Sequence, residues 1–267
     1  ELALENPKSP PMFCMLLRKH IGSGKLLSIR QSGLDRVLSF VFETVNELGD
    51  LTTVTLVAEI MGRHSNLILT DAGGRILDAI KRVSDEVSSV RTVLPGGTYQ
   101  APPGQDKINL LEEEDGPVMA RFFSARTPDC AKAVMQALSG VSPVLARELV
   151  FRALKGQDIE TGQLSGYYKN RLREEVAKLR ETLRTGKAAF TAVSDEEKRI
   201  REFTLCDIEQ YGAVKEKRRY ESPSALLDHF YAERDRVARM KQRSHDLLKL
   251  LVNTTDRIAK KLALQEE

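Results

Sequence analysis

The sequence has few of the residues and patterns that mark several large protein classes. Its three cysteines, Cys14, Cys130 and Cys206, show no Cys-x-x-Cys or histidine spacing, which excludes a disulfide framework and a zinc ribbon. They indicate buried free thiols in a reducing compartment, the cytoplasm. No apolar run approaches the roughly 18 residues that cross a bilayer, so a membrane-spanning protein is excluded. Nucleophile elbows, P-loops, dinucleotide fingerprints and HExxH motifs are also missing, and we predict no enzyme, metal or cofactor.

Charge is balanced overall, so its distribution is more informative than its sum. The 267 residues include 41 Lys and Arg against 38 Asp and Glu, a formal net charge of +3, and 41% hydrophobic residues, enough for a buried core. Residues 12–36 contain several lysines and arginines with Asp35 as the only acid, whereas residues 112–115 are all acidic. The length predicts about two domains.

The first part of the chain has the pattern of an antiparallel meander. Pro10 and Pro11 lead into an amphipathic stretch that ends near Gly22, which predicts a helix. Short apolar or alternating runs, which predict strands, follow at residues 26–30, 37–42, 53–60, 67–70 and 75–81. Asp71–Gly74 is typical of a hairpin turn, because glycine tolerates positive φ angles. Residues 95–104 predict an extended exit from the sheet.

Helical spacing begins after Asn109, at residues 129–139, 143–155 and about 163–185. Alternation over residues 199–220 predicts strands that return to the first sheet. The fold class is therefore α+β, an antiparallel β domain with an inserted helical region and a long coiled-coil helix. The predicted parts are a main β part at 1–112, a helical region at 113–190, returning strands at 191–221 and the start of a coiled-coil arm at 222–267.

Both ends of the chain lead us to expect a piece of a longer protein. The chain begins at Glu1 without an initiator methionine or a signal peptide, and it ends inside the predicted long helix. An antiparallel coiled coil needs a return helix, which we expect outside this sequence. The predicted seam consists of Phe230, Val237, Met240, Leu247, Leu251, Thr254 and Ile258.

Two polar segments near the predicted strand ends are candidates for binding. The adjacent Asp35 and Arg36 fit either a surface ion pair or a recognition pair. In a recognition pair the arginine grips a phosphate or stacks on a base, and the aspartate accepts hydrogen bonds from base amino groups. The second segment places Arg63, His64 and Asn66 between two apolar strands, with more polar groups than a turn requires. A structural role fits His64 as well as a binding role does.

A third segment, residues 138–148, resembles a helix-hairpin-helix. Gly140 and Ala146 match its core pattern h-x-G-h-G-x-x-x-A, while Ser142 replaces the second glycine. Backbone N–H groups of such a hairpin bind phosphate without reading sequence, and a plain turn between two helices fits the spacing equally well. The candidate phosphate contacts are Gly140, Ser142, Arg18 and Lys19.

Five segments taken together resemble the NFACT family: PPMFCMLLRKHI (10–21), GLDR (33–36), EIMGRHSNLIL (59–69), RTVLPGGTYQAPP (91–103) and FYAERDRVARMKQRSHDLLKLL (230–251). The resemblance covers essentially the whole chain. It implies an NFACT-N domain similar in fold to formamidopyrimidine-DNA glycosylases, a helix-hairpin-helix region and a coiled coil, followed in the family by an NFACT-R domain. Family chains lack the processed N-terminal proline of those glycosylases, so no glycosylase activity is implied.

The resemblance implies a non-catalytic role in ribosome-associated quality control. Such a factor binds a large ribosomal subunit obstructed by peptidyl-tRNA, recruits alanyl-tRNA and supports addition of C-terminal alanines without mRNA, while the ribosome makes the peptide bond. The resemblance assigns recognition of the tRNA anticodon arm to Asp35 and Arg36, and contact with the ribosome near its stalk base to the coiled coil. Polar density alone adds Arg63, His64 and Asn66 as tRNA-binding candidates.

Two other functions compete with this one. A fibronectin-binding surface adhesin is suggested by the other name given to bacterial members of the family, and the free cysteines count against it. A DNA-repair lyase follows from the glycosylase-like fold, and the missing N-terminal proline and zinc-type cysteines count against it.

Overall fold

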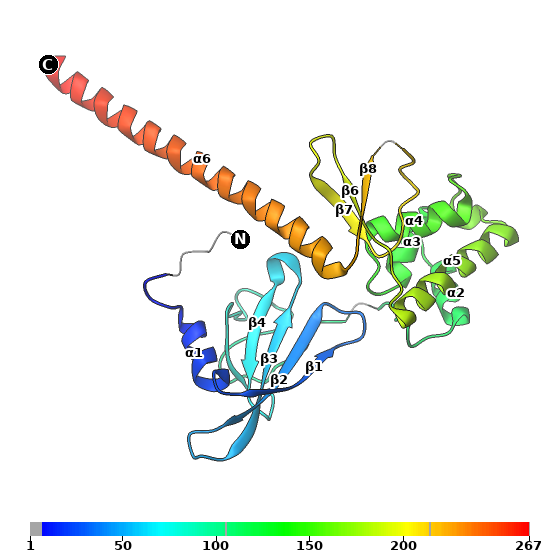
Figure 1. The fold of residues 1–267 in the computed structure, drawn as a ribbon, viewed down its shortest axis with the longest axis horizontal. Coiled ribbons are helices and arrows are strands. Elements are labelled where there is room, and N and C mark those ends of the chain that lie inside the picture. Colours follow the sequence, from blue (N-terminus) through cyan, green and yellow to red (C-terminus); the bar gives the residue numbers. More distant parts are fainter. Residues whose placement is uncertain (1–6, 105, 214, 267) are drawn as a thin grey trace. The chain divides into compact units, whose positions relative to one another are not determined.

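A computed structural model describes residues 7–104, 106–213 and 215–266. Figure 1 traces the chain from blue to red. It forms two compact units, which we call unit 1 and unit 2: Glu1–Glu114 with Gln136–Gly140, and Asp115–Met135 with Val141–Glu267.

Unit 1 is built on the predicted meander. The strands are β1 (Lys25–Gln31), β2 (Val37–Val45), β3 (Leu51–Glu59), β4 (Asn66–Thr70) and β5 (Ile76–Ala79). They lie in sequence order and every neighbouring pair is antiparallel. The predicted hairpin turn between β4 and β5 is confirmed, because Asp71 Oδ1 accepts from the N–H groups of Gly73 and Arg75, both at 2.9 Å, and Gly74 has a φ angle of +78°.

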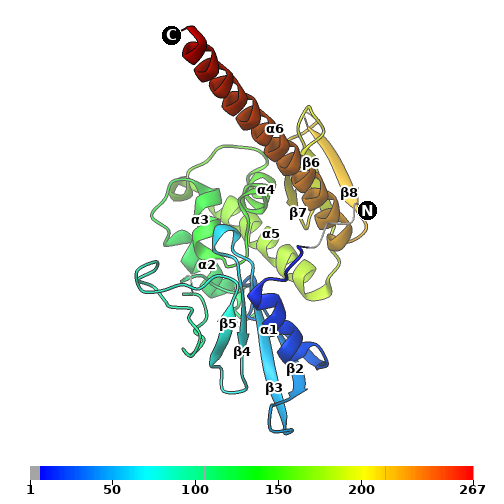
Figure 2. The same ribbon diagram turned by 90° about the vertical axis from the view of Figure 1, so that its left-hand side faces the viewer.

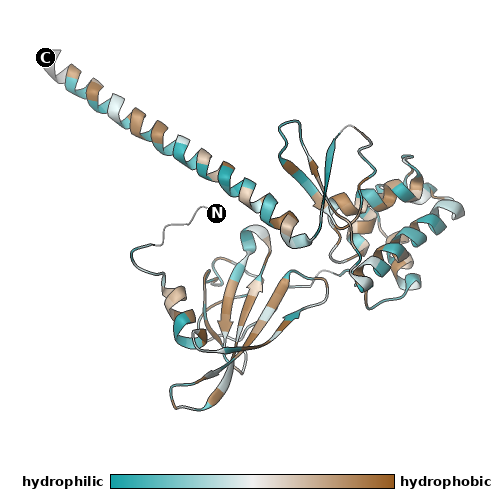
Figure 3. Ribbon diagram, in the orientation of Figure 1, coloured by the Kyte–Doolittle hydropathy of each residue, from teal (hydrophilic) through white to brown (hydrophobic). Residues whose placement is uncertain are grey.

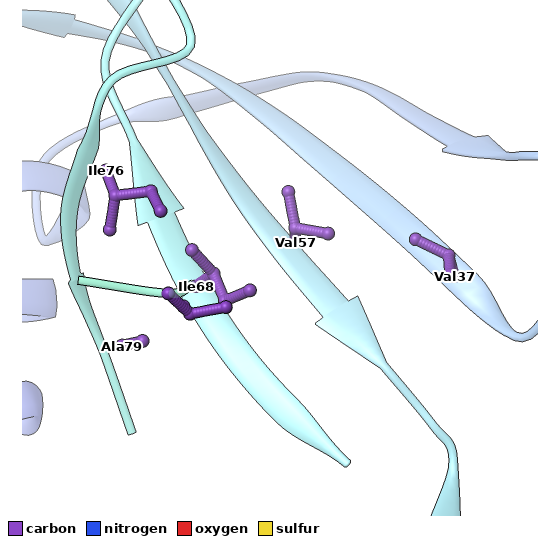
Figure 4. Close-up of a cluster of buried hydrophobic side chains, with 6 residues drawn as sticks. Val37, Val57, Ile68, Ile76 and Ala79 are labelled. Carbon is purple, nitrogen blue, oxygen red and sulfur yellow. The ribbon is translucent and has the colours of Figure 1, made fainter. Parts of the chain in front are cut away.

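Different segments cover the two faces of this sheet. The predicted first helix is confirmed as α1 (Met12–Ile21), which packs Phe13 against Val54 and Leu69 on one face (Figure 2). The opposite face holds a second buried cluster, which the chain after β5 completes (Figure 4). That cluster consists of Val37, Val57, Ile68, Ile76, Ala79 and Val93. Side chains on both faces of β3 and β4 are therefore buried, which holds their register in place, whereas β1 at the edge of the sheet is mostly exposed.

Helices dominate the first part of unit 2. They are α2 (Asp115–Phe123), α3 (Cys130–Ala137), α4 (Pro143–Leu154), the short η2 (Thr161–Gln163) and α5 (Gly166–Thr185). The last two residues of α3 belong to unit 1. The predicted helices correspond to α3, α4 and α5. The sequence pattern does not predict α2, because Gly116 and Pro117 in its first turn are typical of a loop. Proline is tolerated there because first-turn N–H groups have no partner within the helix.

The strands after α5 form a sheet of their own, so the predicted return to the first sheet is wrong. These strands are β6 (Phe190–Ser194), β7 (Ile200–Thr204) and β8 (Glu216–Tyr220), in the spatial order β7-β6-β8. The central strand β6 buries Val193 with Val144 of α4 on one side and Ala192 with Leu226 on the other. Alternation indicates a strand but cannot identify its partner, and packing against helices of unit 2 decides the pairing.

The predicted long helix is confirmed as α6 (Pro223–Glu266). Ser222 Oγ accepts from the N–H of Ala225 at 3.1 Å and caps its start, and Phe230 packs edge-on against Phe203 of β7. Beyond these first turns, apolar and polar residues alternate along the helix and its large apolar side chains are exposed (Figure 3). The coiled-coil pairing stays a prediction. Among the described residues, none of the helices combines the length and apolar character that crossing a lipid bilayer requires.

Candidate functional site

The two polar segments singled out from the sequence lie at the same end of the unit 1 sheet. In an antiparallel meander every second turn returns to the same end. The register shows this directly, because Val37 at the start of β2 pairs with Glu59 at the end of β3, and Glu59 pairs with Asn66 at the start of β4. We call residues 32–36 and residues 60–65 together the turn surface.

Asp35 and Arg36 are exposed in the first turn of this surface. Gln31 Nε2 donates to the Asp35 carbonyl oxygen at 2.9 Å, and Gly33 has a φ angle of +54°, a conformation that favours glycine. The N–H of Ile60 donates to the Arg36 carbonyl oxygen at 2.8 Å. This last hydrogen bond ties the first turn to the second and fixes the position of the Asp35–Arg36 pair.

Arg63 and His64 are exposed in the second turn, the short helix η1 (Gly62–His64). Arg63 Nε donates to His64 Nε2 at 2.9 Å. The Oγ atom of Ser65 accepts from the N–H of Met61 at 2.9 Å and closes the turn. A cation and an imidazole therefore face solvent together, beside the turn that carries Arg36.

Asn66 has a structural task. Its side chain is buried, with Nδ2 donating to the Lys81 carbonyl oxygen at 2.8 Å and Oδ1 accepting from the Lys81 N–H at 2.9 Å. Because both ends of the amide are engaged, Asn66 positions the turn, and its contact with tRNA stays a prediction. Lys81 Nζ donates to the Arg63 carbonyl oxygen at 3.0 Å, which adds a further cation that no sequence pattern indicates.

A buried ion pair lies next to both turns, because its acid Glu59 pairs in register with Val37 after the first turn and with Asn66 after the second. The carboxylate of Glu59 has no solvent exposure, it pairs with the guanidinium of Arg91, and Tyr99 Oη donates to its Oε1 atom at 3.0 Å. Burial, and then the charge of Glu59, raise the pKa of Tyr99 to about 12, so its phenol stays protonated and keeps donating. The sequence signal for this cluster is an acid at an inward-facing position of an apolar strand.

The hairpin between α3 and α4 is present, and its two candidate residues have local tasks. Gly140 belongs to unit 1, has a φ angle of +72° and lies against Leu34 of the first turn. Ser142 belongs to unit 2, where its Oγ atom accepts from the N–H of Leu145 at 3.3 Å and caps α4. Phosphate binding by this hairpin stays a prediction.

The cations of α1 do not lie at the turn surface. Lys19 Nζ pairs with Glu47 Oε1 at 2.6 Å, and Glu47 follows β2 at the opposite end of the sheet. Both side chains are mostly exposed, so this pair stabilises little, although the hydrogen bond from Lys19 lowers the pKa of Glu47. Arg18 lies in the same last turn of α1. The basic residues at 12–36 therefore do not form one continuous patch.

The fold and the turn surface define an α+β protein in which a five-stranded meander is followed by helices, a small second sheet and a long helix. The family model for NFACT N-terminal and middle domains matches residues 1–267, and the chain belongs to this family.

Curated relatives are similar over nearly the whole chain. The Rqc2 homolog RqcH of Bacillus subtilis is 40% identical over 276 residues, which cover 99% of this chain and 44% of that protein. The Rqc2 homolog RqcH of Streptococcus suis is 30% identical over 98% of this chain and 42% of its own length. The chain thus spans less than half the length of these relatives.

Solved structures with the same fold are named for binding fibrinogen or fibronectin, and not as Rqc2 homologues. The fibrinogen-binding protein of Staphylococcus aureus matches with a TM-score of 0.66 and 29% identity over 84% of this chain and 76% of that one. The N-terminal part of the fibronectin/fibrinogen-binding protein of Streptococcus suis matches with a TM-score of 0.64 and 29% identity, over 86% of this chain and 76% of that one.

Proposed function

We propose that this chain binds tRNA through the turn surface, as part of a ribosome-associated quality-control factor. The whole factor holds alanyl-tRNA on a large ribosomal subunit obstructed by peptidyl-tRNA and supports template-independent addition of C-terminal alanines. One observation carries the proposal: Asp35, Arg36, Arg63 and His64 are exposed together at one end of the unit 1 sheet. The Rqc2 homologues among the relatives support the ribosomal setting.

The residue types of the turn surface suit a folded RNA loop. Arg36 and Arg63 can each bind a phosphate through two hydrogen bonds or stack on a base. Asp35 repels phosphate, so its place beside Arg36 favours a hydrogen bond to an amino group of an unpaired base. Phosphate contacts by the arginines position the RNA and the aspartate adds selectivity.

The chain acts in this proposal by binding and orientation. The ion pair of Glu59 and Arg91 and the amide of Asn66 hold both turns before RNA arrives, which reduces the entropy lost on binding. The peptide bond is made by the ribosome, so the chain needs no catalytic residue, metal or cofactor.

A second candidate is a surface adhesin that binds fibronectin or fibrinogen. The names of the solved structures with this fold favour it. The two functions predict different ligands for the same isolated chain, and one set of binding measurements separates them.

The test measures binding of fluorescent tRNA and of immobilised fibronectin to the 267-residue chain, with the double variant Arg36→Ala/Arg63→Ala beside it. Salt should weaken tRNA binding steeply. Because the double variant loses two phosphate contacts, its slope of log K against log salt should be smaller in magnitude by about 1.4 to 1.8. Arg184→Ala is the matched control, because it removes an exposed arginine in the last turn of α5, which is not part of the turn surface. Unchanged tRNA affinity in the double variant contradicts the proposal, and tight fibronectin binding without tRNA binding favours the adhesin.

A further inference from the structure

Unit 2 carries a cluster of cations around an exposed aromatic ring, remote in sequence from the turn surface. Tyr167, in the first turn of α5, has 53% of its surface exposed. Lys155 Nζ lies 5.4 Å from the centroid of its ring, and the guanidinium carbon of Arg171 lies 5.9 Å from it. Cations at these distances interact with the ring electrostatically.

The backbone around this cluster is held firmly. Lys155 ends α4 in the left-handed conformation with a φ angle of +55°, and Gly156 next to it has a φ angle of +75°. Arg171 donates to the carbonyl oxygens of Ala153 and Arg152 at the end of α4, both at 2.9 Å. These bonds join the end of α4 to the start of α5 and fix the place from which Lys155 and Tyr167 project.

The two cations have different freedom. The guanidinium of Arg171 is held by hydrogen bonds to carbonyl oxygens of α4, so it adds positive charge near Tyr167 from a fixed position. The side chain of Lys155 is exposed and its ammonium rests near the ring. Lys155 first, and then Arg171, lower the pKa of the Tyr167 phenol, as expected where the local potential is positive.

We propose that Lys155, Tyr167 and Arg171 form a second RNA-contact surface, which takes an unpaired nucleotide by stacking its base on Tyr167 and pairing its phosphate with Lys155. On binding, the Lys155 ammonium moves from the ring to the phosphate and the base takes its place. An exposed ring flanked by cations suits single-stranded RNA, because every base has a π-face and every nucleotide has a phosphate. This inference does not require the turn surface to bind tRNA.

The same helix offers a matched control. Lys169 Nζ lies 5.0 Å from the centroid of Phe123 in α2, so it also places a cation over an aromatic ring. Residues two positions apart on a helix are rotated by about 200°, so Lys169 and Tyr167 point to different sides of α5. Lys169→Gln therefore removes a similar cation without touching the proposed surface.

The experiment measures fluorescence anisotropy of a labelled oligouridylate of about 12 nucleotides, titrated with the full chain at several salt concentrations. Tyr167→Ala should weaken binding by roughly tenfold, because one stacked base is lost, and Tyr167→Phe should bind like the parent. Lys155→Asn, which tolerates the left-handed conformation, should reduce the magnitude of the slope of log K against log salt by about 0.7. Lys169→Gln should change neither quantity.

The series is repeated in the Arg36→Ala/Arg63→Ala background, so that failure here is distinguishable from failure of the turn surface. If Tyr167→Ala does not weaken oligouridylate binding in either background, the second surface is overturned, whether or not the turn surface binds tRNA. Equal affinity of Tyr167→Ala and the parent overturns it, and so does competition by polyglutamate as effective as competition by unlabelled RNA, which indicates a site for acidic peptides. Circular dichroism confirms folding, which an exposed ring should not affect.

Discussion

A Cβ atom added to Gly140 would lie 2.9 Å from the Cβ atom of Leu34. Gly140 therefore packs directly against the turn that carries Asp35 and Arg36, within unit 1. Real Cβ atoms do not approach this closely, so any larger residue at position 140 must displace Leu34 or the turn.

Gly140→Ala should destabilise the protein and weaken tRNA binding together. The variant forces alanine into a φ angle of +72° and adds the contact with Leu34, at a combined cost of about 2–4 kcal/mol. Gly186→Ala is the matched control, since its φ angle is +68° and nothing lies within 4 Å of the added Cβ atom. In urea unfolding, the free energy of unfolding of Gly140→Ala should be lower than that of Gly186→Ala by about 1 kcal/mol or more. Equal stability of the two variants would show that Leu34 yields freely.

Arg91→Met should destabilise unit 1 strongly, because it leaves the carboxylate of Glu59 buried without its cation. Removing one partner of a buried pair typically costs about 3–5 kcal/mol. The double variant Glu59→Met/Arg91→Met should recover part of that loss, since no charge is then left buried. Thermal melting of the parent, the single variant and the double variant checks this, and a double variant less stable than Arg91→Met contradicts it.

Tyr99 should make stability fall at alkaline pH. Its folded-state pKa of about 12 lies above its ordinary value, about 10 when unfolded. The contribution is therefore fully present below pH about 10 and is lost as pH rises towards 12, because the unfolded chain releases the proton first. Comparing the free energy of unfolding at pH about 9 and about 11.5, Tyr99→Phe should show a fall smaller by about 1 kcal/mol, a figure discounted for the half-buried phenol. Tyr167→Phe, whose phenol has a lowered pKa, should not reduce the fall.

Arg36→Ala should reduce discrimination among tRNAs more than overall affinity. The reason is that Asp35 and Arg36 act as a pair, in which the acid reads a base and the arginine holds the adjoining nucleotide. Affinities for alanine tRNA and for several other tRNAs, measured at one salt concentration, should converge in the variant. An equal loss towards every tRNA would leave Arg36 as a phosphate contact without a role in selectivity.

Local sequence pattern predicts the structural features that depend on residues close in sequence. It does not predict contacts between residues that are distant in sequence. The strand runs predict the meander, and alternate turns of a meander meet, so Arg36 and Arg63 at one end follow from the sequence. The partners of buried polar groups do not follow. Asn66 bonds to Lys81, 15 residues away, and Glu59 to Arg91, 32 residues away, and both depend on how the chain after β4 packs. The separate sheet of β6 to β8 escaped prediction for the same reason, because alternation does not specify a partner strand.

Substitutions of Asn66 and His64 should differ in their effect on stability, although both should weaken tRNA binding. Asn66→Ala leaves the N–H and the carbonyl of Lys81 without their partner, at a cost of about 1–3 kcal/mol, and releases the turn that carries Arg63. It should lower both the melting temperature and the affinity for tRNA. His64→Ala removes an exposed side chain, so it should lower the affinity alone. A variant of Asn66 that melts like the parent but binds tRNA weakly would place Asn66 among the residues that touch RNA.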